Sequence, residues 1–215
     1  NDGTFVDQSY ASGILNGGWG WASCIIDFDN DGLLDIINTN GWNIESGVTL
    51  EYESHDSDTT SLFKNIGDNK FIRMNDSVGI TDTGQGRSMI CFDHDNDGDI
   101  DILISNNDVG DNSLIFYENV SISGNFLKID LRIKDTNTYA LGARVYLTVI
   151  NDKGEQTQRM REVNINSNFT SQTPSQLHFG VSQAENIAEI KIVWPNGDIQ
   201  TLTDIAVNQS LVIEQ

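Results

Sequence analysis

An acidic motif that occurs twice, 66 residues apart, constrains the fold of this chain more than any other feature. Shifting the sequence by 66 places residues 1–42 on residues 67–108 without a gap. The motif has the form Asp-x-Asp-x-Asp-Gly-x-x-Asp, at residues 27–35 and again at residues 93–101. A gapless internal repeat indicates one supersecondary unit that is copied along the chain.

Short apolar runs of strand length flank both acidic segments. Residues 22–26 and 88–92 lead into them, and residues 34–37 and 100–104 lead out. A turn at 66–69 separates two further runs, which is the pattern of a β-hairpin. Because four short strands per unit are typical of a propeller blade, we expect an all-β N-terminal part built from blades.

The acidic segments have the ligand chemistry of a calcium loop. Carboxylates at alternate positions repel one another unless a cation lies between them, and Gly at the sixth position allows a tight turn. Hard oxygen donors without Cys or His favour Ca²⁺ over zinc or copper, and Mg²⁺ is less suited because it retains its waters. We therefore predict two Ca²⁺ sites, with ligands from Asp27, Asp29, Asp31, Leu33 (carbonyl) and Asp35, and from Asp93, Asp95, Asp97, Asp99 (carbonyl) and Asp101.

The motif differs from an EF-hand. An EF-hand needs Glu at position 12 and helices on both sides. Position 12 is Asn38 in the first copy and Ile104 in the second, and both flanks favour strands. The alternative to a metal site is a solvated acidic turn.

The charge is distributed unevenly along the chain. Twelve Lys and Arg oppose 32 Asp and Glu, and residues 1–124 carry almost all of the net charge of −20. Such a shift indicates two modules, which we place at 1–124 and 125–215, with small polar residues around Gly124 as the connector. The acidic balance argues against nucleic acid and against anionic lipid as partners. No run approaches 18 apolar residues, so we expect no membrane insertion.

Residues 125–215 also show strand patterns, at 126–133, 142–150 and 187–194 among others. Strands at this spacing predict a small β-sandwich or barrel. We expect His178 to be packed and hydrogen-bonded. Arg144 fits a structural ion pair, with a ligand contact as the alternative.

Other residues leave two interpretations open. Cys24 and Cys91 lie in apolar runs, which favours buried free thiols, although a disulfide remains possible. The insertion at 43–61 is either a mobile acidic surface loop or a binding loop. Trp19, Trp21 and Trp42 could contact a sugar or a protein partner, or pack between blades.

The acidic repeats resemble FG-GAP/VCBS repeats, the blade units of integrin-α-like propellers. The match consists of the acidic loop followed by Leu62-Phe63-Lys64-Asn65-x-Gly-x-x-Lys70-Phe71. Residues 125–215 resemble the ASPIC/UnbV domain. The segments that carry this second resemblance are Thr136-Asn137-x-x-Ala140-x-Gly142-Ala143-Arg144-Val145, Ser171-Gln172, His178-Phe179-Gly180 and Val193-Trp194-Pro195-Asn196-Gly197. Together they imply an incomplete, Ca²⁺-stabilised β-propeller followed by a small β domain.

The resemblance also implies a secreted or cell-surface adhesion or interaction module. We expect it to be non-enzymatic, because no nucleophile elbow, phosphate loop or His/carboxylate metal triad is found in the sequence. Its partner would be an extracellular protein or a glycan. The alternatives are an accessory domain of a secreted enzyme and a structural subunit of a surface assembly. Since two blades cannot close a ring, we expect further blades from the same or another chain, and an external partner for a strand near residues 4–7.

Overall fold

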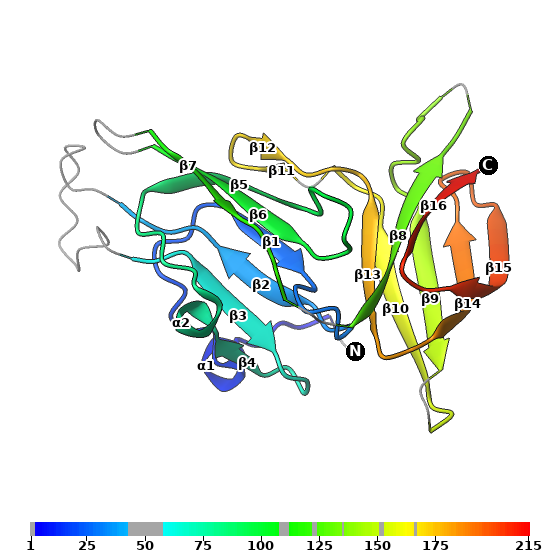
Figure 1. Ribbon diagram of the computed structural model, residues 1–215, viewed down its shortest axis with the longest axis horizontal. Coiled ribbons are helices and arrows are strands. Elements are labelled where there is room, and N and C mark those ends of the chain that lie inside the picture. Colours follow the sequence, from blue (N-terminus) through cyan, green and yellow to red (C-terminus); the bar gives the residue numbers. More distant parts are fainter. Residues whose placement is uncertain are drawn as a thin grey trace.

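The computed structural model describes residues 3–42, 58–107, 112–121, 124–134, 136–150, 153–165 and 167–215. Most of the insertion at 43–61 lies outside the described residues. The regular secondary structure of the described chain is almost entirely strand, as the sequence predicts. Two open sheets form the N-terminal half, and a pair of facing sheets forms the C-terminal half (Figure 1).

The N-terminal half contains one four-stranded and one three-stranded antiparallel sheet, each with its strands in chain order. The first sheet consists of β1 (Ser23–Ile26), β2 (Asp35–Asn38), β3 (Ser61–Asn65) and β4 (Phe71–Arg73), and the second of β5 (Gly86–Phe92), β6 (Asp101–Asn106) and β7 (Leu114–Tyr117). One-turn helices α1 (Ser9–Ser12) and α2 (Asn75–Val78) precede β1 and β5. Neither described helix has the length needed to cross a membrane.

The two sheets repeat one another at the offset seen in the sequence. Ile26 pairs with Asp35 across the first acidic loop, and Phe92 pairs with Asp101 across the second. The helices also correspond, since each ends at a glycine in the left-handed conformation. Sequence periodicity therefore predicted a real structural repeat.

Residues 4–7 form no strand in this single chain, and their pairing with an external partner stays a prediction. Their counterpart, β4, pairs with β3, whereas no described strand pairs with residues 4–7. Phe5 is consequently fully exposed. The described sheets are open and no propeller is identified, so the all-β class is confirmed and the ring of blades stays a prediction.

Apolar residues from both N-terminal sheets share one core. Cys24 on β1 and Cys91 on β5 lie in this core and form a disulfide, with their Cα atoms 6.5 Å apart. The preference for free thiols was therefore wrong. The cause is that β1 and β5 are neighbours across two different sheets, a relationship that local sequence patterns do not contain.

The C-terminal half is a β-sandwich rather than a closed barrel. One sheet has the order β10-β9-β14-β15, and the other has the order β13-β8-β16 with β16 parallel to β8. The strands are β8 (Asn125–Arg132), β9 (Arg144–Ile150), β10 (Gln156–Glu162), β13 (Leu177–Ser182), β14 (Asn186–Val193), β15 (Ile199–Ala206) and β16 (Gln209–Glu214); β11 (Ser167–Asn168) and β12 (Ser171–Gln172) form a small separate ribbon.

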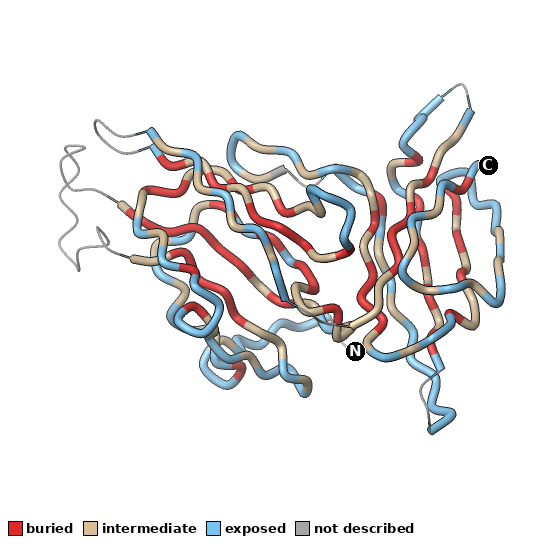
Figure 2. The backbone as a smooth tube through the Cα atoms, in the orientation of Figure 1, coloured by how far each residue is buried: buried red, intermediate tan, exposed pale blue. Residues whose placement is uncertain are grey.

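Alternating burial on β8 explains how the sandwich meets the N-terminal sheets. Leu127 and Ile129 point into the sandwich core, where they are fully buried. Lys128 lies between them on the opposite face and is also buried, because that face packs on the second acidic loop. Figure 2 shows buried segments on both sides of this junction. Polar side chains on three strands of the sandwich contact the loops: Lys128 on β8, Arg159 on β10 and His178 on β13.

Candidate metal centre

The two acidic loops have the same backbone conformation. The fourth position is in the left-handed region in both, with φ of 55° at Asn30 and 67° at Asn96. The sixth position follows it there, with φ of 91° at Gly32 and 97° at Gly98. Glycine meets the requirement of this sixth position without steric cost, as the sequence motif predicted.

The first carboxylate of each loop closes the turn. Asp27 Oδ2 accepts a hydrogen bond from the Gly32 amide at 2.9 Å, and Asp93 Oδ2 accepts one from the Gly98 amide at 2.9 Å. Equal contacts at equivalent positions show that the repeat extends to side-chain geometry.

The last carboxylate of each loop joins the loop to the neighbouring strand. Asp35 accepts the amide protons of Phe28 at 3.1 Å and Asn65 at 2.7 Å. Asp101 accepts those of His94 at 2.8 Å and Asn119 at 2.8 Å. Both side chains are buried, so these bonds fix the loop against its sheet.

Three carboxylates of the first loop converge. One ligand oxygen from each of Asp27, Asp29 and Asp35 lies within 4.8 Å of the others. Asp27 is 2% exposed, and its Oδ1 atom is buried without a hydrogen-bond partner among the described residues, as is Oδ1 of Asp29. Buried oxygen atoms without donors suit a bound cation, which would replace the missing partners.

The electrostatics of the first loop also favour a cation. Burial, and after it the charge of Asp31, raises the pKa of Asp27 to about 7. Burial likewise raises the pKa of Asp35 to about 6. Clustered carboxylates resist ionisation until a positive charge compensates them. The residues present therefore fit a hard divalent cation.

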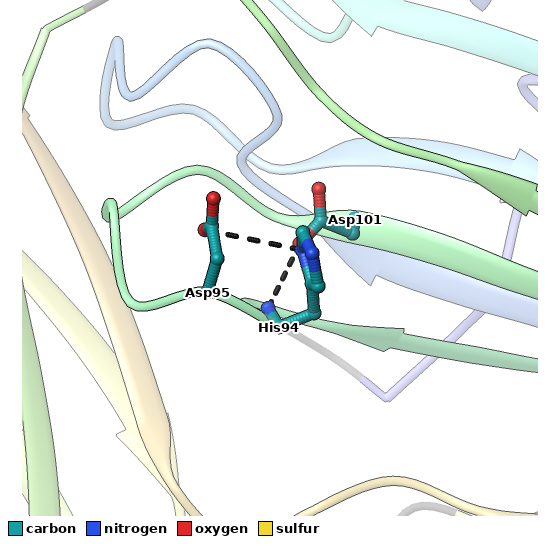
Figure 3. Close-up of side chains that lie close together, drawn as sticks. All are labelled: His94, Asp95 and Asp101. Carbon is teal, nitrogen blue, oxygen red and sulfur yellow. Dashed lines mark hydrogen bonds and ion pairs between the residues drawn. The ribbon is translucent and has the colours of Figure 1, made fainter.

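In the second loop two overlapping sets of ligand atoms lie within 4.8 Å of one another: Asp93, Asp95 and Asp97, and His94, Asp95 and Asp101. The second set combines a histidine with carboxylates, a kind of cluster that the sequence argument did not find. Within it, Oδ2 of Asp101 lies 2.9 Å from Nδ1 of His94 (Figure 3). Since a carboxylate only accepts, Nδ1 carries the proton. The sequence argument overlooked His94, although alignment of the loops places it at the position of Phe28.

The carboxylate at the fifth position of each loop accepts a hydrogen bond from the backbone amide two residues further on. Asp31 accepts the Leu33 amide at 2.8 Å, and Asp97 accepts the Asp99 amide at 2.9 Å. The Asp99 side chain accepts a hydrogen bond from Asn30 at 2.9 Å, which ties the two loops together.

Basic side chains, which the sequence argument did not assign to the loops, contact them from two directions. Lys64 on β3 contacts Asp29 and lies 3.0 Å from Asp31. From the sandwich, Lys128 lies 2.6 Å from Asp93. The alternation of β8 could have indicated Lys128, which interrupts an apolar run.

The sandwich also binds the loop backbones. His178 Nε2 donates to the Gly98 carbonyl at 3.0 Å, and the Ser182 amide donates to the Asn30 carbonyl at 2.8 Å. Arg159 Nε donates to the Gly32 carbonyl at 3.2 Å. The prediction that His178 is packed and hydrogen-bonded is confirmed. The C-terminal half packs directly on both acidic loops.

Two other sequence features have clear positions. Arg144 forms an exposed ion pair with Glu162 at 2.8 Å, which agrees with the predicted structural ion pair. The half-buried Trp19, Trp21 and Trp42 stack on one another. The ring centroids of Trp19 and Trp42 lie 5.1 Å apart, and those of Trp21 and Trp42 lie 6.0 Å apart. Arg87 of β5 covers the Trp21 ring at 4.4 Å, so this cluster joins the two sheets.

The chain is similar in sequence to known proteins, and its C-terminal half matches a family model. The chain is 24% identical to cartilage acidic protein 1 of Mus musculus over 193 residues, which is 87% of this chain and 27% of the mouse protein. It is 22% identical to cartilage acidic protein 1 of Homo sapiens over 245 aligned residues, covering 91% of this chain and 36% of the human protein. The chain thus spans about a third of these relatives or less. Residues 133–215, which contain β9 to β16, match the family model described as ASPIC and UnbV.

Proposed function

We propose that this chain is an extracellular, non-enzymatic interaction module whose two acidic loops bind Ca²⁺. The observation that carries the proposal is the convergence of carboxylate oxygens in both loops, with Asp27 Oδ1 and Asp29 Oδ1 buried and without donors among the described residues. An all-oxygen set of this kind matches the preference of Ca²⁺.

Further support comes from the surroundings of the loops. The Cys24–Cys91 disulfide is typical of proteins in oxidising, extracellular compartments. The similarity to cartilage acidic protein 1 and to the ASPIC and UnbV family fits a module of this type. Because the sandwich rests on both loops, bound Ca²⁺ would hold the surface that meets a partner protein or glycan in one arrangement.

Calorimetric titration of the chelator-stripped chain with Ca²⁺ tests the metal sites directly. We expect two binding events with dissociation constants on the order of 10⁻⁴–10⁻³ M, the range of extracellular calcium modules. At a tenfold excess over the dissociation constant, each site would add about 1.4 kcal/mol to the free energy of unfolding. The melting temperature should therefore fall when chelator is added.

Paired variants make this test specific. Asp29→Asn and Asp95→Asn remove one ligand charge from each loop at nearly constant shape, and each should abolish one binding event. Asp76→Asn, at an exposed position of α2, removes the same charge elsewhere and should leave both events unchanged. A stripped chain with no binding heat and a melting temperature indifferent to Ca²⁺ and chelator would refute the proposed metal sites.

A further inference from the structure

One structurally equivalent position beside the two loops carries side chains of opposite charge. Ile36 of β2 pairs with Phe63, and Ile102 of β6, at the same repeat position, pairs with Tyr117. The residue that follows each partner is therefore also equivalent. It is Lys64 beside the first loop and Glu118 beside the second.

Hydrogen bonds confirm this correspondence. The residue after Lys64 is Asn65, whose amide donates to Asp35 at 2.7 Å. The residue after Glu118 is Asn119, whose amide donates to Asp101 at 2.8 Å. The same backbone anchor thus carries a positive side chain at one loop and a negative side chain at the other.

Lys64 occupies the carboxylates that a metal would use in the first loop. Its ammonium contacts Asp29 and lies 3.0 Å from Oδ2 of Asp31, at the third and fifth loop positions. Although partial burial opposes it, hydrogen bonding to these two residues raises the pKa of Lys64. The Lys64 ammonium is therefore a positive charge held against two carboxylates of the first loop.

The second loop has no equivalent ammonium among the described residues. Glu118 is exposed. The pKa of the neighbouring His94 is raised chiefly by the hydrogen bond that its ring donates to Asp101, and then by the charges of Asp101, Asp95 and Glu118. Lys128 approaches this loop from the sandwich and contacts the first position, Asp93, together with Asn96. Lys128 does not contact Asp95 or Asp97, the counterparts of Asp29 and Asp31; the basic group beside Asp95 is the His94 ring, 3.9 Å away.

We propose that Lys64 is a built-in competitor for Ca²⁺ that makes the first loop the weaker site. Calcium binding there displaces the ammonium from Asp29 and Asp31, whereas Glu118 adds negative charge beside the second loop. The second loop fills first as the calcium concentration rises. This inference rests on the proposed function, and it goes further by assigning different affinities to the two loops and naming the residues that set them.

Reciprocal charge exchange tests the inference in single-site backgrounds. In an Asp95→Asn chain, titration with Ca²⁺ reports the first loop, and Lys64→Gln should lower its dissociation constant about tenfold, the effect of one unit charge on a divalent ion near a protein surface. Lys64→Glu should lower it further. In an Asp29→Asn chain, Glu118→Lys should raise the dissociation constant of the second loop by at least the same factor.

Lys70→Gln is the matched control, because Lys70 lies on the same hairpin but donates to the Ala11 carbonyl. It should leave both dissociation constants unchanged. If Ca²⁺ binds both loops and neither Lys64→Gln nor Glu118→Lys shifts the affinities, the inference is overturned while the proposed function stands. Absence of calcium binding to either loop would overturn both. Should Lys64→Gln fail to fold, Glu118→Lys decides, because it places the same charge at the other loop.

Discussion

Lys128 Nζ lies 2.6 Å from Asp93 Oδ2, and the two side chains are only 2% and 1% exposed. The ammonium comes from the sandwich and the carboxylate from the second acidic loop. A second bond from Lys128 to Asn96 at 2.9 Å adds to the same contact. The two halves of the chain are thus joined by a buried ion pair.

Breaking this pair from one side should be costly. Lys128→Met keeps the length of the side chain but leaves Asp93 buried without its cation, which costs about 3–5 kcal/mol of unfolding free energy. Urea denaturation in chelator measures this loss. The double variant Lys128→Met/Asp93→Asn should recover part of it, because neither charge is then buried alone.

The exposed pair of Arg144 and Glu162 provides the contrast. Arg144→Met should leave the urea midpoint nearly unchanged, because solvent screens exposed ion pairs. Equal losses in Lys128→Met and Arg144→Met would contradict the assignment of the buried pair as the anchor between the halves.

The Cys24–Cys91 disulfide should be a large contributor to stability. It spans 67 residues of sequence, and closing a loop of that length is worth about 4 kcal/mol when the chain-entropy estimate is applied. Both positions are buried, so we choose Cys24→Ala/Cys91→Ala, because serine at either position would place a hydroxyl group in the core. Thermal unfolding of this variant should match that of the reduced parent. A parent protein whose two thiols react with an alkylating agent after unfolding without reductant would show that the disulfide is absent.

The sequence carried much of the local structure because that structure is periodic. The alternation around residues 27–35 and 93–101 predicted the strands, the glycine turns and the clustered carboxylates. Contacts between distant segments were not predictable in this way. Lys64 reaches Asp29 from another strand, and Cys24 meets Cys91 across two sheets. Such pairs depend on how sheets are placed in space, and one sequence does not encode that placement in any local pattern.

Gly98 should be intolerant of a side chain because it packs closely against the sandwich, in addition to having a positive φ. Gly98 and Gly142 both have positive φ, of 97° and 88°. A Cβ atom at Gly98 would lie 2.0 Å from the ring of Phe126 on β8, whereas Gly142 has no atom within 4 Å. Gly98→Ala should therefore destabilise the protein by about 1–3 kcal/mol more than Gly142→Ala. Equal urea midpoints for the two variants would show that the loop does not pack closely on the sandwich.

His178 should make stability depend on pH below neutrality. Burial lowers its pKa to about 4, with the neighbouring Arg161 and Lys128 also disfavouring the charged ring, while the Gly98 carbonyl and Asp93 act in the opposite direction. The unfolded chain takes up a proton near pH 6.5, whereas the folded chain does so only near pH 4. The unfolded state therefore binds more protons between these values. Its contribution to stability is complete above pH 6.5 and is lost as the pH falls towards 4.

His178→Gln isolates this effect, because a glutamine amide can still donate to the Gly98 carbonyl but does not titrate. Unfolding free energies of the parent and the variant should be compared from pH 7.5 to 4.5 in excess chelator, so that titration of the acidic loops affects both equally. We expect the advantage of the parent over the variant to shrink by up to about 3 kcal/mol across this range, the energy equivalent of the pKa difference. A constant difference between the two proteins at all pH values would mean that His178 is not held neutral by the packing of the sandwich on the loops.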